Sequence, residues 1–375
     1  MPRSIPPDPD AVGTRNRGCS QHEAIGDLHL AADAFGNAVE AFRAALAETP
    51  AGAAADRVRL LLRIAKAEQL RGQLQDGLKS AQAARAIARR IGDPKLNAFV
   101  ASGLSDLQIE MGSPRRALRY ARYGYRVLRD TTEHDAVARL SLAMGYALAR
   151  SGQPQLAIDW LQSAAAMYRR CENADGLVNA LNNLGLVYKN LREWREATRC
   201  LEQALEIDQR KGLFARMRTH HQNLGLIRFR LGQWDVAEEH YRQSLRIARE
   251  LSHPGGEASA QLALGMLARR RRQLDRAEEM FRSALELSTK AGARREIELS
   301  HEFLAEVELD RGNGPAALAL IEPALEHSRA QAPHGDVTME LTIRLGIALR
   351  MVGRTSEAHM QLSRGLAMAE ASGDR

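Results

Sequence analysis

The sequence predicts an all-α solenoid, in which nine helix-turn-helix repeats stack one after another. Two observations support this fold class. A pattern of small residues recurs about every 40 residues over most of the 375-residue chain, and the composition favours helices over strands. Aromatic residues make up only 5% of the chain, whereas the good helix formers alanine, leucine, arginine and glutamate are abundant. Because a solenoid grows without adding separate cores, this length does not require several domains.

The first helix of each repeat, helix A, carries one small residue directly after an apolar one. This glycine column contains Gly26, Ala65, Ser105, Gly145, Gly185, Gly225, Gly265, Ala305 and Gly346. Twelve positions later, on the second helix, helix B, a second column contains Ala38, Gly77, Ala117, Ala157, Ala197, Ala237, Ala277, Ala317 and Ala358. Seven positions further, a third contains Ala45, Ala84, Gly124, Ala164, Ala204, Ser244, Ala284, Ala324 and Gly365. Small side chains let two helix axes approach closely, so helices A and B should pack at these positions.

Helix ends recur in the same register as the small-residue columns. Helix A should end at a glycine in six repeats, where the left-handed conformation terminates a helix: Gly72, Gly112, Gly152, Gly232, Gly312 and Gly353. Helix B should end in the same way at Gly92, Gly212, Gly292 and Gly373. Pro114 and Pro154 suit the first turn of the helix that follows.

The motif Leu184-Gly185-x-x-Tyr188, followed by Ala197 and by an aromatic residue equivalent to Tyr241, resembles the tetratricopeptide repeat. The resemblance runs from about Cys19 to the end of the chain, and it implies a right-handed superhelix whose A helices line a concave groove. The repeat unit of about 40 residues is similar to the long repeats of kinesin light chains, of the Leu-Gly-Asn-rich adaptor of G-protein signalling, and of sensor arms in bacterial regulators. Residues 1–18 are rich in proline and arginine, and we expect them to be disordered. Repeats 2 and 3 have Ala81 and Ala121 where a large residue normally packs, so we expect them to be looser.

Motifs for catalysis are missing from the sequence. The three cysteines are far apart, and no CxxC pair, phosphate-binding loop or nucleophile elbow is present. The neighbours His220 and His221 should line the groove or pack rather than bind a metal. We therefore expect no enzyme activity, no cofactor and no metal site. No stretch is apolar enough to span a bilayer and no signal peptide precedes the repeats, which predicts a cytoplasmic protein.

The resemblance implies a peptide-binding groove on the A helices of repeats 4 to 7. Read at the groove-facing offsets from the glycine column, the candidate residues are Arg139, Tyr146, Arg150, Asn179, Asn182, Leu186, Lys189, Asn190, Gln222, Leu226, Phe229, Arg230, Met266, Arg269 and Arg270. Six of them are basic and none is acidic, whereas repeats 3 and 8 place Asp106, Glu110, Glu302, Glu306 and Asp310 at the same offsets. The groove should therefore be basic in the middle and acidic at both shoulders. The alternative is that these charges only solvate the helix faces of an arginine-rich chain.

Three functions remain compatible with the sequence. The favoured one is a scaffold or adaptor that binds another protein through a peptide segment, with an acidic segment matching the net charge of +7. The alternative is a ligand- or peptide-sensing regulatory arm of a larger bacterial signalling or transcription regulator, with an effector domain beyond the C-terminus. Direct binding of nucleic acid is the least favoured, because the tyrosines and arginines of residues 119–126 should pack on helix B.

Overall fold

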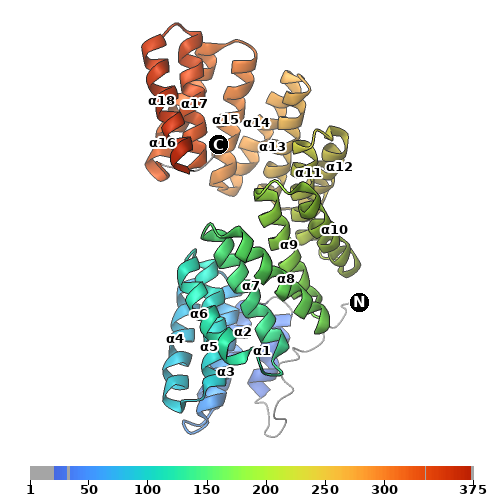
Figure 1. Ribbon diagram of the computed structural model, residues 1–375, viewed down its shortest axis with the longest axis vertical. Helices are drawn as coiled ribbons and strands as arrows, with labels where there is room; N and C mark the ends of the chain where they lie inside the picture. The colour runs from blue at the N-terminus through green and yellow to red at the C-terminus, as the bar shows by residue number, and fades with distance from the viewer. Residues whose placement is uncertain (1–20, 32–33, 334, 373–375) are drawn as a thin grey trace. The chain divides into compact units, whose positions relative to one another are not determined.

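The computed structural model describes residues 21–31, 34–333 and 335–372, and within them it contains eighteen α-helices and no strand (Figure 1). Odd-numbered helices are the A helices of the repeats and even-numbered helices are the B helices. The predicted all-α repeat class is confirmed. The N-terminal segment predicted to be disordered lies outside the described residues, as does Cys19. No described helix has the length and apolar character that crossing a bilayer requires.

The chain divides into two compact units, the first ending at Glu193 and the second beginning at Trp194. Unit 1 contains α1 (Gln21–Ala31), α2 (Phe35–Glu48), α3 (Ala54–Leu70), α4 (Leu74–Ile91), α5 (Pro94–Glu110), α6 (Pro114–Leu128), α7 (His134–Arg150), α8 (Pro154–Arg170) and α9 (Ala174–Asn190). Unit 2 contains α10 (Trp194–Lys211), α11 (Phe214–Arg230), α12 (Trp234–Glu250), α13 (Pro254–Arg270), α14 (Leu274–Ala291), α15 (Arg294–Asp310), α16 (Gly314–Gln331), α17 (Asp336–Met351) and α18 (Thr355–Ser372). Repeat 5 therefore contributes its helix A to unit 1 and its helix B to unit 2.

Within each unit, every helix packs against its neighbours in sequence, as expected for a stack of helical hairpins. A helices also pack against the A helix of the next repeat, in the series α3, α5, α7 and α9 of unit 1 and the series α11, α13, α15 and α17 of unit 2. The described B helices make no comparable contact with one another. The A helices are therefore the more closely spaced set, which is the property of the inner face of a curved stack.

The helices end and begin at the glycines and prolines that the sequence predicted. All nine predicted break glycines in the described residues have positive φ, from 63° at Gly292 to 84° at Gly72. Pro94, Pro114, Pro154 and Pro254 occupy the first position of their helices, where a missing N–H is not needed. In four breaks the same left-handed conformation is adopted by a residue other than glycine, and these residues are Glu172, Arg192, Ser252 and Arg272.

The glycine column allows a large residue of helix B to press against the backbone of helix A. A Cβ atom added to Gly225 would lie 2.5 Å from the Tyr241 ring, and one added to Gly265 would lie 2.5 Å from the Phe281 ring. Both rings are fully buried. Each ring belongs to the residue sixteen positions after its glycine, so the close approach recurs with the repeat.

Repeats 2 and 3 use the opposite combination of sizes. Ala65 replaces the glycine and packs in the same cluster as Ala81, while Ser105 replaces it in repeat 3, where Ala121 stands at the large-residue position. Ala81 and Ala121 are both fully buried, and the Ser105 hydroxyl donates a hydrogen bond of 3.0 Å to the Ala117 carbonyl. In these repeats a residue larger than glycine on helix A is thus combined with a smaller residue on helix B. The looser packing expected for repeats 2 and 3 is not seen at these positions.

Candidate peptide-binding face

The predicted groove residues lie on α7 and α9 of unit 1 and on α11 and α13 of unit 2, and they differ in exposure. Exposed side chains are Arg150, Asn179, Asn190, Arg230 and Arg270. Half-buried side chains are Arg139, Tyr146, Asn182, Leu186, Lys189, Gln222, Leu226, Met266 and Arg269. Phe229 is a correction to the prediction, because it is buried in a core cluster with Ala237 and Tyr241. It packs toward helix B and is not available to a ligand.

On unit 1, the predicted basic centre and its acidic neighbour lie close enough to interact. The Arg139 guanidinium of α7 lowers the pKa of Asp106 on α5, but burial has the larger effect and raises that pKa overall. Burial also lowers the pKa of the Lys189 ammonium on α9. The exposed guanidinium of Arg150 forms no ion pair within the described residues. Of the basic groups predicted here, Arg150 therefore presents the most accessible charge.

On unit 2, a chain of hydrogen bonds connects three A helices. Gln222 Nε2 of α11 donates to the Ser259 carbonyl oxygen of α13 at 3.2 Å. The Ser259 hydroxyl in turn donates to Glu296 Oε1 of α15 at 2.9 Å. These bonds fix the register of neighbouring repeats. Arg230 and Arg270 lie at the C-terminal ends of α11 and α13, are exposed, and form no ion pair within the described part of the chain.

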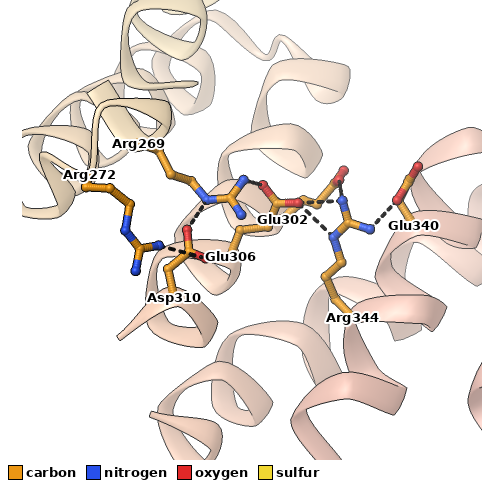
Figure 2. Close-up of polar contacts among 7 residues, drawn as sticks. All are labelled: Arg269, Arg272, Glu302, Glu306, Asp310, Glu340 and Arg344. Carbon is orange, nitrogen blue, oxygen red and sulfur yellow. Dashed lines mark hydrogen bonds and ion pairs between the residues drawn. The ribbon is translucent and has the colours of Figure 1, made fainter. Parts of the chain in front are cut away.

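The predicted acidic shoulder of repeat 8 is an internal ion-pair ladder (Figure 2). Arg269 of α13 pairs with Glu306 of α15, and its Nε lies 2.6 Å from Asp310 Oδ2. Arg344 of α17 pairs with Glu306 from the other side and also with Glu340 on its own helix. Arg269, predicted as a basic groove residue, is thus already neutralised by the carboxylates of the next repeat.

Glu302 is the most buried carboxyl group of this ladder. It is 4% exposed and lies 3.6 Å from Arg344. Burial raises its pKa to about 8, the Arg344 guanidinium opposes this rise, and the nearby Glu306, Glu340 and Asp336 carboxylates add to it. We therefore expect Glu302 to be protonated at neutral pH, where its carboxyl group can donate as well as accept a hydrogen bond.

The neighbouring histidines of repeat 6 have different environments. His220 is 2% exposed and its Nε2 lies 3.0 Å from Oδ2 of the fully buried Asp208. Arg216 Nε donates to both oxygens of Asp208, at 3.0 and 3.1 Å. His220 is therefore part of a packed interior network. His221 instead faces His240 of α12, a partner nineteen residues away that no sequence motif indicates.

The stacked helical hairpins, the small-residue columns and the closely spaced A helices define an α-solenoid repeat protein. The family model of the tetratricopeptide repeat matches residues 136–210, 216–290 and 296–371, which together are more than half of the chain. The chain therefore belongs to the tetratricopeptide repeat family. A search of curated proteins found no relative with significant sequence similarity.

Solved structures with the same fold cover nearly the whole chain. The apo form of RapI is 14% identical, with a TM-score of 0.73 over 95% of this chain and 99% of the other. The apo form of the quorum sensor NprR from B. thuringiensis is 12% identical, with a TM-score of 0.73 over 91% and 94% of the two chains. A Rap protein complexed with Competence and Sporulation Factor is 11% identical, with a TM-score of 0.64 over 94% and 98%. At these identities the similarity concerns the fold.

Proposed function

We propose that this protein is a scaffold or adaptor that binds an acidic peptide segment of another protein on the A helices of repeats 4 to 7. The main support comes from two side-chain amides, Asn182 and Gln222, which occupy the same offset on α9 and α11. Asn182 Oδ1 and Gln222 Oε1 are buried, and neither accepts a hydrogen bond within the described residues. A buried acceptor without a partner costs about 1 to 3 kcal/mol. Rotation of either side chain toward a bound segment would let a backbone N–H of that segment donate to its oxygen.

The surrounding side chains supply apolar contact and charge. Tyr146, Leu186, Leu226 and Met266 follow the glycine column directly and are half-buried, so each can bury further surface against a ligand. The three exposed arginines, Arg150, Arg230 and Arg270, are defined here as the free arginine set. Exposed ion pairs contribute only about 0 to 1 kcal/mol each, so these arginines would orient and select the segment while the apolar contacts hold it.

The test of charge selection uses a library of random decapeptides displayed on beads. We expect the full-length protein to enrich peptides that contain aspartate and glutamate. Replacing the free arginine set by glutamate, as Arg150→Glu, Arg230→Glu and Arg270→Glu together, should abolish that enrichment. The matched control replaces three exposed arginines of B helices, as Arg122→Glu, Arg126→Glu and Arg170→Glu, and should retain it. Equal loss in both triple variants would show that only the net charge matters.

The test of the amide acceptors uses two neighbouring asparagines of α9. Asn182→Ala removes the unsatisfied acceptor, so affinity for any enriched peptide should fall about tenfold, which corresponds to one hydrogen bond of about 1.4 kcal/mol. Asn183→Ala is the control, because the Asn183 amide already donates to the Asn179 carbonyl at 3.0 Å on the same helix. Unchanged affinity in Asn182→Ala would remove the main support for this peptide-binding face.

A second candidate function, a peptide-sensing regulatory arm, is favoured by the structural neighbours. NprR is described as a quorum sensor, and a Rap protein was solved with Competence and Sporulation Factor bound. Both share the fold over more than nine-tenths of this chain. A sensor would change its own structure on binding, whereas a rigid scaffold would not. Scattering measured with and without an enriched peptide separates the two, since only the sensor predicts a change in the radius of gyration.

A further inference from the structure

The first described helix, α1, exposes two apolar side chains at positions that are buried in every later repeat. Leu28, two positions after the glycine column, is 71% exposed. Its counterparts in the other eight repeats are at most 6% exposed, and they are Ala67, Leu107, Ala147, Val187, Ile227, Leu267, Val307 and Ala348. Ile25, directly before the column, is also exposed, whereas the apolar residue at that position is buried in the other eight repeats. Ile25 and Leu28 are defined here as the head face.

The last described helix, α18, exposes apolar side chains in the same way. Leu366, twenty positions after the glycine column, is 60% exposed. The residue at that position is buried or half-buried in every other repeat, as Leu46, Arg85, Tyr125, Ala165, Leu205, Leu245, Leu285 and Leu325. Leu362, sixteen positions after the column, is half-buried, whereas its eight counterparts are fully buried. Leu362 and Leu366 are defined here as the tail face.

The positions of Leu366 and Leu28 are the two sides of the contact between successive repeats. Leu325 of α16 and Ala348 of α17 belong to one core cluster. The same two positions share a cluster at three other junctions, in the pairs Leu46 with Ala67, Leu245 with Leu267, and Leu285 with Val307. The tail face is thus the surface that a following helix A covers elsewhere in the chain, and the head face is the surface that a preceding helix B covers.

We propose that the tail face of one copy of this protein packs against the head face of a second copy, so that α18 meets α1 as α16 meets α17. A second copy is favoured over an unrelated partner because one chain carries both halves of a contact that it already forms at its internal repeat junctions. The end repeats of solenoids usually present polar outer surfaces, whereas α1 and α18 present leucine. A head-to-tail contact joins two different surfaces, so further copies can add unless a ring closes.

A set of three charged residues connects successive repeats in unit 2. Glu306 pairs with Arg269 of the preceding repeat and with Arg344 of the following repeat. Arg269 lies four positions after its glycine column, Glu306 one position after, and Arg344 two positions before. A carboxylate between two arginines is thus a polar contact that accompanies the apolar one at the repeat junctions.

The two ends of the chain contain the same three groups, divided between them. Asp27 of α1 and Arg63 of α3 occupy the positions of Glu306 and Arg344, and they form an ion pair. Arg350 of α17 occupies the position of Arg269; it is exposed and forms no ion pair within the described residues. In a head-to-tail contact, Arg350 of one copy would approach Asp27 of the next copy and complete the set.

The test measures the sedimentation velocity of the full-length protein over a wide range of concentration. The parent should form species larger than a monomer as its concentration rises. Leu28→Asp and Leu366→Asp each place a charge in one face, so each variant alone should stay monomeric. An equimolar mixture of the two should form a dimer and nothing larger, because only one intact junction can form.

Leu156→Asp is the matched control, because Leu156 is an exposed leucine of α8 in repeat 4 and belongs to neither face. It should assemble as the parent does. Because all three leucines are exposed, circular dichroism should show thermal unfolding like that of the parent in each variant. A parent or a mixture that stays monomeric would overturn the proposal. Assembly of Leu28→Asp alone would also overturn it, since two tail faces would then pair with each other.

The charged contact has a separate measurement. Arg350→Glu should raise the dissociation constant of the assembly about fivefold, which is the equivalent of one exposed ion pair. An unchanged dissociation constant would overturn the assigned register of α1 on α18.

Discussion

Gly255 and Gly265 lie on the same helix, α13, but they meet different surroundings. A Cβ atom added to Gly255 would meet nothing closer than 3.7 Å, whereas one added to Gly265 would lie 2.5 Å from the Phe281 ring. Helix propensity favours alanine over glycine by about 1 kcal/mol at both positions. Only steric contact with helix B distinguishes them, so the two positions isolate the reason for the glycine column.

The first prediction compares these two glycines. Gly265→Ala should lower the free energy of unfolding by about 1 to 3 kcal/mol, because the ring and the helix must move apart. Gly255→Ala should be neutral or stabilise by up to about 1 kcal/mol. Urea unfolding monitored by circular dichroism measures both. If the two variants unfold at the same urea concentration, close packing is not the reason for glycine in the column.

The second prediction concerns the left-handed helix ends. Ser252 and Gly212 end helix B in two successive repeats, with φ of 49° and 68°. The left-handed conformation costs a residue with a Cβ roughly 1 to 2 kcal/mol. Ser252→Gly should therefore stabilise the protein by up to about 1 kcal/mol, and Gly212→Ser should destabilise it by a similar amount. Thermal unfolding checks both signs, and two shifts in the same direction would refute the argument.

At the residue scale, the sequence predicted the small residues and the helix-ending glycines that recur in each repeat. It did not predict the positions where another residue takes the place of the glycine. The glycines at helix ends could be predicted because the left-handed conformation needs them, but Arg192 and Arg272 adopt the same conformation without that signal. In repeat 2 the helix A residue is larger than glycine and the facing helix B residue, Ala81, is smaller than the usual ring. Comparing Ala65 with the residue sixteen positions later would have revealed this. Phe229 was misplaced because a residue four positions after the glycine column also faces helix B.

At the scale of helices, neighbouring A helices are connected by polar side chains as well as by apolar contact. Arg269 and Glu306 are 37 residues apart, and Arg269 and Asp310 are 41 apart, so both pairs span one repeat. Opposite charges separated by about one repeat length are a signal that the sequence contains. Counting charges within each repeat missed it, because the partner lies in the next repeat.

The third prediction tests the buried carboxyl group of this ladder. The folded-state pKa of Glu302 is about 8, above its ordinary value of 4.5, so the folded protein binds this proton more tightly than the unfolded chain. The associated stability is present at low pH and is lost as pH rises through about 8. Between about pH 6 and pH 9 the loss from this residue should be about 3 kcal/mol.

Urea unfolding of Glu302→Gln at several pH values checks this prediction. The variant has no proton to lose, so its stability should fall less than that of the parent over the same range. Glu326→Gln, at an exposed position of α16, should follow the parent. Parallel stability curves for Glu302→Gln and the parent would mean that Glu302 is already ionised at neutral pH.

For the molecule as a whole, each of the two solenoid units carries A helices with predicted groove residues, α7 and α9 in unit 1 and α11 and α13 in unit 2. The count of 53 lysines and arginines overstates the positive charge available to a ligand, because internal ion pairs neutralise arginines such as Arg269, Arg311 and Arg344. The fold could be predicted because small residues at a fixed period restrict helix packing strongly. The proposed ligand-binding side chains could be predicted only from their offsets from the glycine column. Their exposure and their ion pairs depend on residues one repeat away, which those offsets do not include.

The last prediction concerns how salt affects peptide binding. The Debye length falls from about 30 Å at 0.01 M salt to about 8 Å at 0.15 M, so steering by the free arginine set should weaken over this range. With three exposed contacts of about 0 to 1 kcal/mol each, affinity for an enriched acidic peptide should fall roughly tenfold but not vanish. Most of the change should be in the association rate, because exposed charges act mainly on encounter.

Stopped-flow fluorescence with a labelled acidic peptide measures these rates. The parent should lose association rate with added salt while its dissociation rate changes little. The triple glutamate variant should lack this salt-dependent decrease, because its charges no longer attract the peptide. Nucleic-acid binding would instead weaken by a factor of about 10³ or more for six or more phosphate contacts over a similar change in salt. An affinity for acidic peptide that does not depend on salt would show that apolar contact alone selects the ligand and that Arg150, Arg230 and Arg270 are only solvated helix ends.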